Sequence, residues 1–361
     1  MSVNKKLDRT PLYKNHKKID AKLAPFAGWE MPEMYGNILK EHLHTRSANS
    51  IFDICHMGEF IIEGKKAEKD LENLLSCGLA SLGSGRCRYG FLLNDEGFFI
   101  DDLIIFKYSC TRFMIVVNSS RITNDAEWIC SHLSTSTSFT NISDKTAKID
   151  LQGPLSFKTA SSVFPDIEFV VMNRFAFIEF EYEGIKLTAS TTGYTGELGF
   201  EFFMPPESAV TIWELLLEVD SVKPAGLSSR NSLRLEKGLP LYGYDITDKI
   251  TPIEANLERF VNFNKDFIGK DALIRQIRNK PARILTPFLC AGRSTAREGF
   301  TIYKDNKPAG VVTSGVFSPM LNKGIGLAMI DQSISAVGTI IECRKDDTKI
   351  NAVIIDLPFI R

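Results

Sequence analysis

The stretch NDEGFFIDDLIIFKYSCTRFMIVV, residues 94–117, decides the fold class of this 361-residue chain. It opens with turn-forming residues at 94–97, and two runs rich in β-branched and aromatic residues follow at 98–108 and 113–117. Such runs joined by short connections are typical of antiparallel strands. The segment therefore predicts an antiparallel sheet rather than the strand–helix alternation of a parallel one.

A second set of strands is expected around another short turn. Residues 175–182 and 185–191 flank the turn at Glu183-Gly184, and 198–204 would add a third strand. A glycine-bearing loop separates the second of these strands from the third. The pattern again predicts antiparallel pairing.

Helices are predicted where apolar residues recur at helical spacing. Residues 66–77 and 207–219 show this pattern, and Ser228 is a candidate cap for a third helix that runs toward Gly238. Strands followed by helices and then by strands again indicate an α+β protein. We therefore expect mostly antiparallel sheets with flanking helices.

The chain is expected to divide near Asn279-Lys280-Pro281, which has the composition of a linker. Beyond it, short strand-like pieces alternate with turns, which predicts a small all-β region. The expected division is thus 1–278, itself composed of two interleaved parts, and 282–361. The length of the chain also favours two or three domains over one.

Composition narrows the classes of function. With 43 basic and 44 acidic side chains the net charge is -1, so the overall field does not attract polyanions and nucleic acid is not the expected ligand. No stretch is apolar and long enough for a signal-peptide core or a membrane span. A cytoplasmic protein without membrane contact is expected.

A metal site is not expected. The seven cysteines are scattered without a CxxC pair, which indicates reduced thiols. In Glu41-His42-Leu43-His44 the two histidines are two residues apart, so on a helix they point to different faces. His56 lacks a neighbouring nucleophile of hydrolase type, and we interpret it as structural.

The pair Asp101-Asp102 is the first candidate for chemistry. On a strand, alternation places Asp102 on the face of Ile100 and Ile104 and Asp101 on the opposite face with Leu103. A carboxylate within an apolar row is costly to bury unless it has a dedicated partner or ligand. The alternative is that the pair lies at a β-bulge or strand end and faces solvent.

The loop around Tyr194 is the second candidate. Gly193, Gly196 and Gly199 recur at every third residue and permit close backbone approach, although no phosphate-binding glycine motif is present. A plain hairpin loop is one interpretation. Because Glu201 follows closely, a site for a planar ligand with a polar edge is the other.

Together with further motifs, these segments resemble the glycine cleavage T-protein family from residue 10 to residue 359. Each motif is weak alone, but their order along the chain is specific. The motifs are TPLY at 10–13, PFAGWEMP at 25–32, FD at 52–53 with HMGE at 56–59, IDDL at 100–103, VVN at 116–118, TGYTGE at 192–197, LRLE at 233–236, LYG at 241–243, DFIGK at 266–270, TSG at 313–315 with FSP at 317–319, and PF at 358–359.

The resemblance implies a three-domain cloverleaf, with residues 1–278 as the folate-binding aminomethyltransferase region and a C-terminal domain of β-barrel or jelly-roll type. It implies transfer of the aminomethyl group from the lipoyl sulfur of H-protein to tetrahydrofolate, which yields 5,10-methylenetetrahydrofolate and ammonia. Tetrahydrofolate is the acceptor co-substrate, and no metal is needed. H-protein is the expected partner, and the enzyme is expected to be a monomer.

The resemblance also implies roles for particular residues. Asp102 is the expected catalytic residue, because it would hydrogen-bond folate near the reacting nitrogens. Glu201 would bind the donor edge of the pterin. The remaining expected folate contacts are Met57, Tyr89, Asn118, Tyr194, Arg230 and Tyr242.

Four positions depart from the family pattern. Cys55 and Phe98 replace a serine and a glycine of the family motifs, and Arg259 stands where a tryptophan is common. Asn231 replaces an acid, which removes a possible partner of Arg230 or Arg234. Roles within that helix are therefore the least supported.

Two other functions share this type of domain. Folate-dependent demethylases act on sarcosine, dimethylglycine or sulfonium compounds, but the intact Asp101-Asp102 pair and the absence of a flavin domain favour aminomethyl transfer. Non-catalytic folate-binding factors of iron-sulfur assembly carry a KGCYxGQE-like motif, and this chain has none. Fold analogy alone does not decide function.

Overall fold

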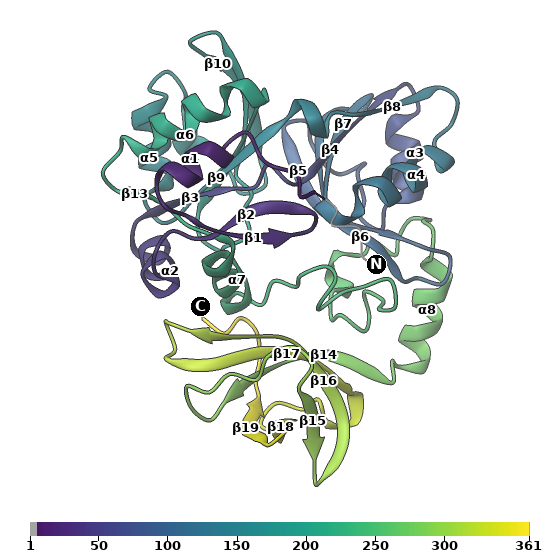
Figure 1. The fold of residues 1–361 in the computed structure, drawn as a ribbon. Coiled ribbons are helices and arrows are strands. Elements are labelled where there is room, and N and C mark those ends of the chain that lie inside the picture. Colours follow the sequence, from purple (N-terminus) through teal and green to yellow (C-terminus); the bar gives the residue numbers. More distant parts are fainter. Residues whose placement is uncertain (1–5, 361) are drawn as a thin grey trace. The chain divides into compact units, whose positions relative to one another are not determined.

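The structure, a computed structural model, describes residues 6–360 (Figure 1). The chain forms two compact units. Unit 1 comprises the residues up to Glu68 together with Ser81–Arg88 and Ile104–Arg230, and unit 2 comprises Lys69–Ala80, Tyr89–Leu103 and Asn231–Arg361. The predicted division into a folate-binding region, 1–278, and an all-β domain, 282–361, stays a prediction.

Unit 1 contains a six-stranded sheet in the order β10-β11-β12-β9-β3-β13. All neighbouring strands are antiparallel except β13 and β3. The strands are β3 (Asn49–Asp53), β9 (Ala147–Gln152), β10 (Phe177–Tyr182), β11 (Ile185–Ser190), β12 (Gly199–Met204) and β13 (Val222–Pro224). The predicted hairpin is confirmed: Glu183 and Gly184 both have positive φ, as two-residue hairpin turns require.

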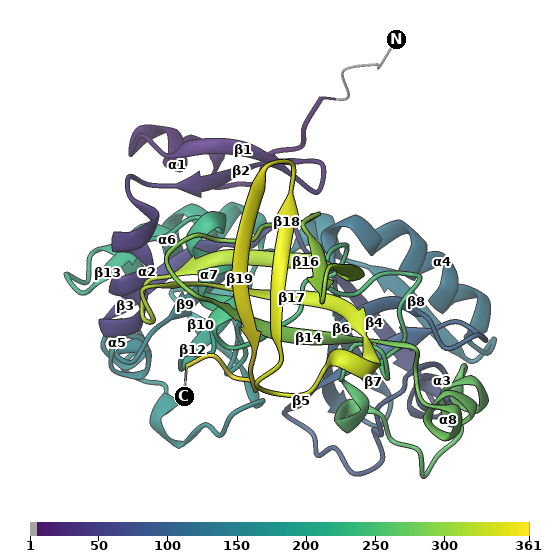
Figure 2. The same ribbon diagram turned by 90° about the horizontal axis from the view of Figure 1, so that it is seen from below.

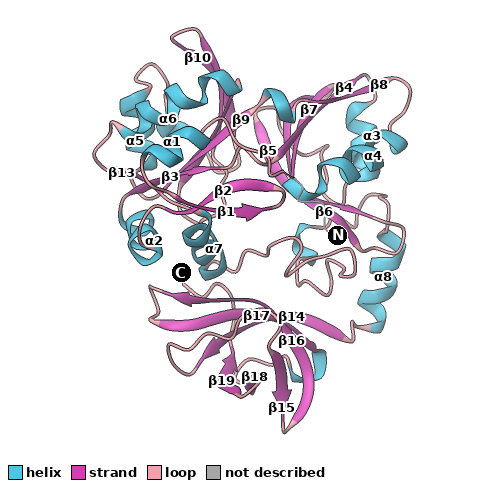
Figure 3. Ribbon diagram, in the orientation of Figure 1, coloured by secondary structure: helices cyan, strands magenta, loops and turns pink. Residues whose placement is uncertain are grey.

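One face of this sheet is covered by α5 (Ser156–Val163) and α6 (Ala209–Leu217) (Figure 3). Alternate strand residues such as Ile149 and Phe202 pack there against Trp213 in one apolar cluster. The helix predicted over 207–219 is thus confirmed in a shorter form. Unit 1 also contains α1 (Tyr13–Lys18), β1 (Lys22–Phe26), β2 (Trp29–Met34), α2 (Ile38–Ser47) and α4 (Ile122–His132).

A five-stranded sheet in the order β5-β6-β7-β4-β8 contains the segment that decides the fold class. The predicted strands are confirmed as β6 and β7, which are antiparallel neighbours. The bounds are β4 (Gly58–Gly64), β5 (Arg86–Leu93), β6 (Phe99–Ser109), β7 (Arg112–Val117) and β8 (Thr137–Asn141). The helix predicted over 66–77 is α3 (Ala67–Leu74), and its apolar stripe is buried as expected.

The C-terminal strands of unit 2 close into a barrel in the order β14-β17-β16-β15-β18-β19 (Figure 2). Their bounds are β14 (Arg283–Cys290), β15 (Thr301–Lys304), β16 (Lys307–Ser318), β17 (Lys323–Asp331), β18 (Ile340–Lys345) and β19 (Thr348–Ile354). The preceding helix α8 (Lys270–Asn279) ends where the linker was expected. The α+β class, the antiparallel sheets and the C-terminal barrel are therefore confirmed.

One helix boundary differs from the prediction. Helix α7 (Leu227–Glu236) begins one residue before Ser228, so Ser228 lies inside the helix rather than at its cap. Leu233 and Leu235 are fully buried, as the pattern requires. The helix still ends before Gly238, whose φ of +69° suits a glycine that follows a helix.

Candidate functional site

The alternation of β9 creates a buried polar face on the six-stranded sheet of unit 1. Ala147, Ile149 and Leu151 point into the apolar cluster beneath the helices, so Lys148 and Asp150 occupy the opposite face. Asp150 pairs in register with Glu201 on β12, which places the two acids side by side. Charged residues of both signs are therefore gathered on one face although all are almost completely buried.

Each charge on this face has a partner of opposite sign. The Nζ of Lys148 lies 3.3 Å from the Oε1 of Glu201, and the Thr192 hydroxyl donates a hydrogen bond to the other oxygen. Arg230, at the start of α7, pairs with Asp150. Buried charges persist only when they are paired and hydrogen-bonded in this way.

A further buried carboxyl group, that of Glu59, adds a third acid to the two cations of this face. Glu59 on β4 is 1% exposed, and neither of its oxygens has a hydrogen-bond partner. Burial raises its pKa to about 8, although the charge of Lys148 opposes the shift. Burial likewise raises the pKa of Asp150 to about 6, against the effect of Arg230. Near neutral pH, Glu59 is therefore mostly protonated.

The loop between β11 and β12 adds an aromatic surface to this face. The guanidinium of Arg230 lies 5.2 Å from the centroid of the Tyr194 ring, within cation–π range. The predicted close approach at the glycines is present: a Cβ at Gly193 or Gly199 would fall 2.2 or 2.4 Å from the side chain of Gln152. The structure thus brings Tyr194, Glu201 and Arg230 together.

Met57 and Asn118 lie at one end of the β4–β7 pair. The Sδ of Met57 is 3.4 Å from the Nζ of Lys148, which joins it to the charged face. Gly58 pairs with Val117, so the residues one step further along each strand, Met57 and Asn118, are neighbours. Five of the eight residues expected from the resemblance therefore lie in unit 1, where Met57, Tyr194, Glu201 and Arg230 are linked through Lys148 and Asp150.

Unit 2 holds the acid pair. Asp101 is fully buried with its neighbours Phe99 and Leu103, whereas Asp102 is half-buried, as alternation predicts. The hydroxyl of Tyr89 donates a 2.8 Å hydrogen bond to the Oδ2 of Asp102. The pair lies within β6, and the full burial of Asp101 means that this acid does not face solvent.

Tyr89 and Tyr242 pack against the same apolar cluster of unit 2. The Tyr89 ring meets Phe91 and Phe260 edge-on at centroid distances of 5.1 and 5.0 Å. Such edge-to-face packing fixes the ring, so the hydroxyl that contacts Asp102 is held in place. Arg259, the departure from the family pattern, stacks 4.8 Å from the Phe260 ring.

The replacement of an acid by Asn231 leaves both arginines of α7 paired. Arg234 donates from Nη1 to Asp245 at 2.6 Å and from Nε to the Asn231 side chain at 2.9 Å. Arg230 uses Asp150 instead. Both arginines therefore keep a carboxylate partner despite the departure.

His56 has the properties of a buried neutral imidazole. Burial lowers its pKa to about 4, and its ring meets Phe26 edge-on at 5.4 Å. Within residues 6–360, no group of three or more His, Cys, Asp and Glu side chains is arranged to hold a metal ion. No helix in the same range has the length and apolar character needed to cross a membrane.

Residues that sequence reasoning missed are Glu59 and the polar face of β9. The signal for β9 is present, because AKIDLQ at 147–152 alternates apolar and polar residues. Glu59 lies inside a quoted motif, but its burial depends on strands from distant parts of the chain. Only the folded structure shows it.

Comparison with known proteins agrees with this architecture. Residues 12–265 match the family model described as GCVT N-terminal domain, and residues 283–360 match the Glycine cleavage T-protein C-terminal barrel domain. The aminomethyltransferase of Caldanaerobacter subterraneus subsp. tengcongensis is 41% identical over 98% of this chain and 96% of its own. That of Thermotoga neapolitana is 36% identical over 98% of both.

A solved structure gives the same result. The glycine cleavage system aminomethyltransferase T from Bartonella henselae superposes with a TM-score of 0.93 at 32% sequence identity, and the match covers 98% of each chain. A fold of antiparallel sheets with a C-terminal barrel, together with these matches, defines a group-transfer enzyme. The chain belongs to the glycine cleavage T-protein family, the aminomethyltransferases. The predicted family and enzyme class are confirmed.

Proposed function

We propose that the enzyme transfers the methylene carbon of an S-aminomethyl-dihydrolipoyl group, carried by H-protein, to tetrahydrofolate. Two C–N bonds form on folate, while the C–S bond and the C–N bond to the amine break. The two folate N–H protons pass to the lipoyl sulfur and to ammonia. The products are dihydrolipoyl H-protein, ammonia and 5,10-methylenetetrahydrofolate.

The observation that carries this proposal is the charged face of unit 1. A buried carboxylate held by Lys148 and Thr192 offers fixed acceptors for the amino and ring N–H groups along a pterin edge. Tyr194 and Arg230 supply flat surfaces beside it. We assign Glu201 to the pterin edge and Met57, Asn118, Tyr194 and Arg230 to further folate contacts.

In unit 2 we assign the catalytic role to Asp102. Its half-buried carboxylate is positioned by the Tyr89 hydroxyl, so one oxygen is already oriented. A positioned carboxylate can accept a proton from a folate nitrogen as that nitrogen attacks carbon, or stabilise the positive charge that develops there. Tyr89 and Tyr242 are assigned as folate contacts. The proposal includes a cytoplasmic, monomeric enzyme that needs no metal.

The test is ammonia release from aminomethylated H-protein. Purified enzyme is expected to release ammonia in a tetrahydrofolate-dependent reaction, and elemental analysis is expected to find no stoichiometric metal. Sarcosine, dimethylglycine and a sulfonium compound form the second arm of the assay, because demethylases share this domain type. Turnover of one of these with none on H-protein would replace the proposal, and folate-independent release would reject it.

A further inference from the structure

The loop that carries Tyr194 is held by the side chain of Gln152. Gln152, at the end of β9, donates from Nε2 to the Thr192 carbonyl at 3.2 Å and accepts from the Thr195 hydroxyl at 2.9 Å. Gly193 and Gly199 press against the same amide, where a Cβ would clash. The loop backbone is therefore wrapped around Gln152.

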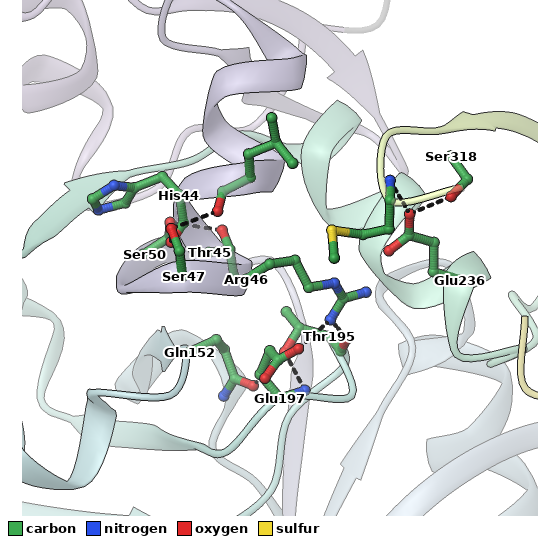
Figure 4. A network of polar contacts seen from close by, with 12 residues as sticks. His44, Thr45, Arg46, Ser47, Ser50, Gln152, Thr195, Glu197, Glu236 and Ser318 are labelled. Carbon is green, nitrogen blue, oxygen red and sulfur yellow. Dashed lines mark hydrogen bonds and ion pairs between the residues drawn. The ribbon is translucent and has the colours of Figure 1, made fainter. Parts of the chain in front are cut away.

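A second side chain reaches the loop from another element. Arg46, near the end of α2, is 5% exposed, and its Nη1 donates to the Thr195 carbonyl at 2.8 Å (Figure 4). The same nitrogen pairs with the Glu197 carboxylate at 2.7 Å. The Glu197 amide in turn donates to the Thr195 hydroxyl at 3.2 Å. The loop is thereby tied to α2 as well as to the sheet.

Tyr194 lies between these anchor points. Thr192 and Thr195, on its two sides, are both fixed by Gln152, and Arg46 fixes Thr195 a second time. Arg230, held by Asp150, lies 5.2 Å from the Tyr194 ring. A ring whose flanking backbone is fixed before the ligand arrives costs less ordering entropy on binding.

We propose that Arg46 is a positioning residue for folate binding: it holds the 192–199 loop, wrapped around Gln152, so that Tyr194 is set in its binding orientation. The inference rests on the proposed function, in which Tyr194 contacts folate. The competing explanation is that Arg46 only attaches α2 to the 192–199 loop and so stabilises unit 1. The two explanations differ in whether the effect of Arg46 passes through Tyr194.

The first measurement separates binding from stability. Arg46→Met is expected to raise the KM and Kd for tetrahydrofolate about tenfold and to leave kcat unchanged, since the lost interaction concerns the ground state and the transition state equally. Arg46→Lys keeps the charge and is expected to recover most of the affinity. Arg112→Met, which removes an ion pair on a half-exposed site of the same unit, is the matched control with unchanged KM.

The second measurement is a double-mutant cycle. In a Tyr194→Ala background, Arg46→Met is expected to change the Kd by no more than about twofold, because the residue through which it acts is gone. Glu197→Gln removes the charge that pairs with Arg46 from a partly exposed position, so it avoids a folding defect. It is expected to raise the Kd about threefold in the wild-type background and to be silent in the Tyr194→Ala background.

The outcomes distinguish this inference from the proposed function. Additive effects of Arg46→Met and Tyr194→Ala, or an unchanged KM in Arg46→Met, would overturn the positioning role while folate binding stands. Folate binding that is unaffected by Tyr194→Ala would overturn it as well. A wild-type enzyme that does not bind tetrahydrofolate would reject the proposed function, and the inference with it.

Discussion

The two units each bury charged side chains, but they do so in different ways. In unit 2 the Oδ2 of Asp245 accepts hydrogen bonds from Arg234, from the Leu241 amide and from the Ser314 hydroxyl, and its Oδ1 accepts one from Thr313. Arg234 donates further to Ser314 at 2.7 Å. Both oxygens of Asp245 are thus occupied by donors of the protein itself.

On the charged face of unit 1, the numbers of positive groups and carboxyl groups differ. Lys148 and Arg230 face three carboxyl groups, and Glu59 has no hydrogen-bond partner for either oxygen. The pKa values of Glu59 and Asp150 are raised because burial is only partly offset by the two cations. We call the network around Asp245 and Arg234 closed and the charged face of unit 1 open. A closed network stabilises a fold, whereas an open network is typical of a binding site.

The largest expected effect is on turnover, and it concerns the acid pair of unit 2. Asp102→Asn is expected to lower turnover by about a hundred- to ten-thousand-fold, because an amide keeps the size but cannot take a proton or stabilise positive charge on the attacking nitrogen. Most of the folate affinity is expected to remain, because the other contacts are unchanged. Steady-state kinetics with a separate folate titration measure both quantities.

Asp101→Asn is the matched control for Asp102. Its side chain lies on the opposite face of β6 and is fully buried, so its replacement is expected to lower turnover far less. Thermal melts of both variants confirm that they fold. An inactive Asp101→Asn enzyme, or wild-type turnover in both variants, would show that the half-buried acid is not the catalytic one.

The next effect tests the closed network. Asp245→Asn leaves the buried Arg234 guanidinium without its countercharge, which is expected to cost about 3 to 5 kcal/mol of stability. Folate affinity at a temperature where the variant is folded is expected to be unchanged. Chemical denaturation measures the loss. Asp266→Asn removes a fully exposed carboxylate from an ion pair and is expected to stay within about 0.5 kcal/mol of wild type.

The third effect tests the open network. Glu201→Gln is expected to weaken folate binding by about 1.5 to 3 kcal/mol, or roughly ten- to a hundredfold in Kd, because charge-assisted hydrogen bonds are lost. The fold is expected to suffer less, since Glu59 can ionise and supply a countercharge for Lys148. Titration calorimetry and thermal melts are compared on one sample. Unchanged affinity would remove Glu201 from the site.

The fold could be predicted wherever the pattern is local. The strands of 94–117 and the hairpin at Glu183-Gly184 follow from alternation and turn chemistry within a few residues. The alternation at 147–152 carries the same local signal for a strand with one polar face. The start of α7 differs by two residues from the start that a cap at Ser228 predicts, because serine is favoured at a cap but is also tolerated within the first turn.

The pairing of charges could not be predicted, because it joins distant segments. Arg234 and Ser314 are 80 positions apart in the chain, as are Asp150 and Arg230. Glu59 has an ordinary place in a motif, and only the strands that pack around it remove its solvent. Alternation indicates that only one acid of the pair meets the ligand, and the family motif selects Asp102; that choice stays a prediction until turnover is measured.

The smallest expected effect is on the pH dependence of stability. It tests whether Glu59, in the open network, lacks a hydrogen-bond partner. The pKa of Glu59 is about 8 in the folded protein against an ordinary value of 4.5, so between these values the folded state holds a proton that the unfolded state has released. The free energy of unfolding must then fall as pH rises through this window. From pH 6.5 to 8 the fall is expected to be about 1 to 2 kcal/mol.

In that interval the titration of Glu59 has a larger effect on stability than the titrations of Asp150 and His56. The raised pKa of Asp150, about 6, acts below it, and the lowered pKa of His56, about 4, removes stability only as pH falls from 6.5. Glu59→Gln cannot ionise, so it is expected to lack this fall, and its stability relative to wild type is expected to rise by about 1 to 2 kcal/mol between pH 6.5 and pH 8. Glu63→Gln, on the same strand but half-exposed, controls for the substitution. Parallel stability profiles for wild type and Glu59→Gln would mean that Glu59 has a partner, and the contrast between the two units would fail.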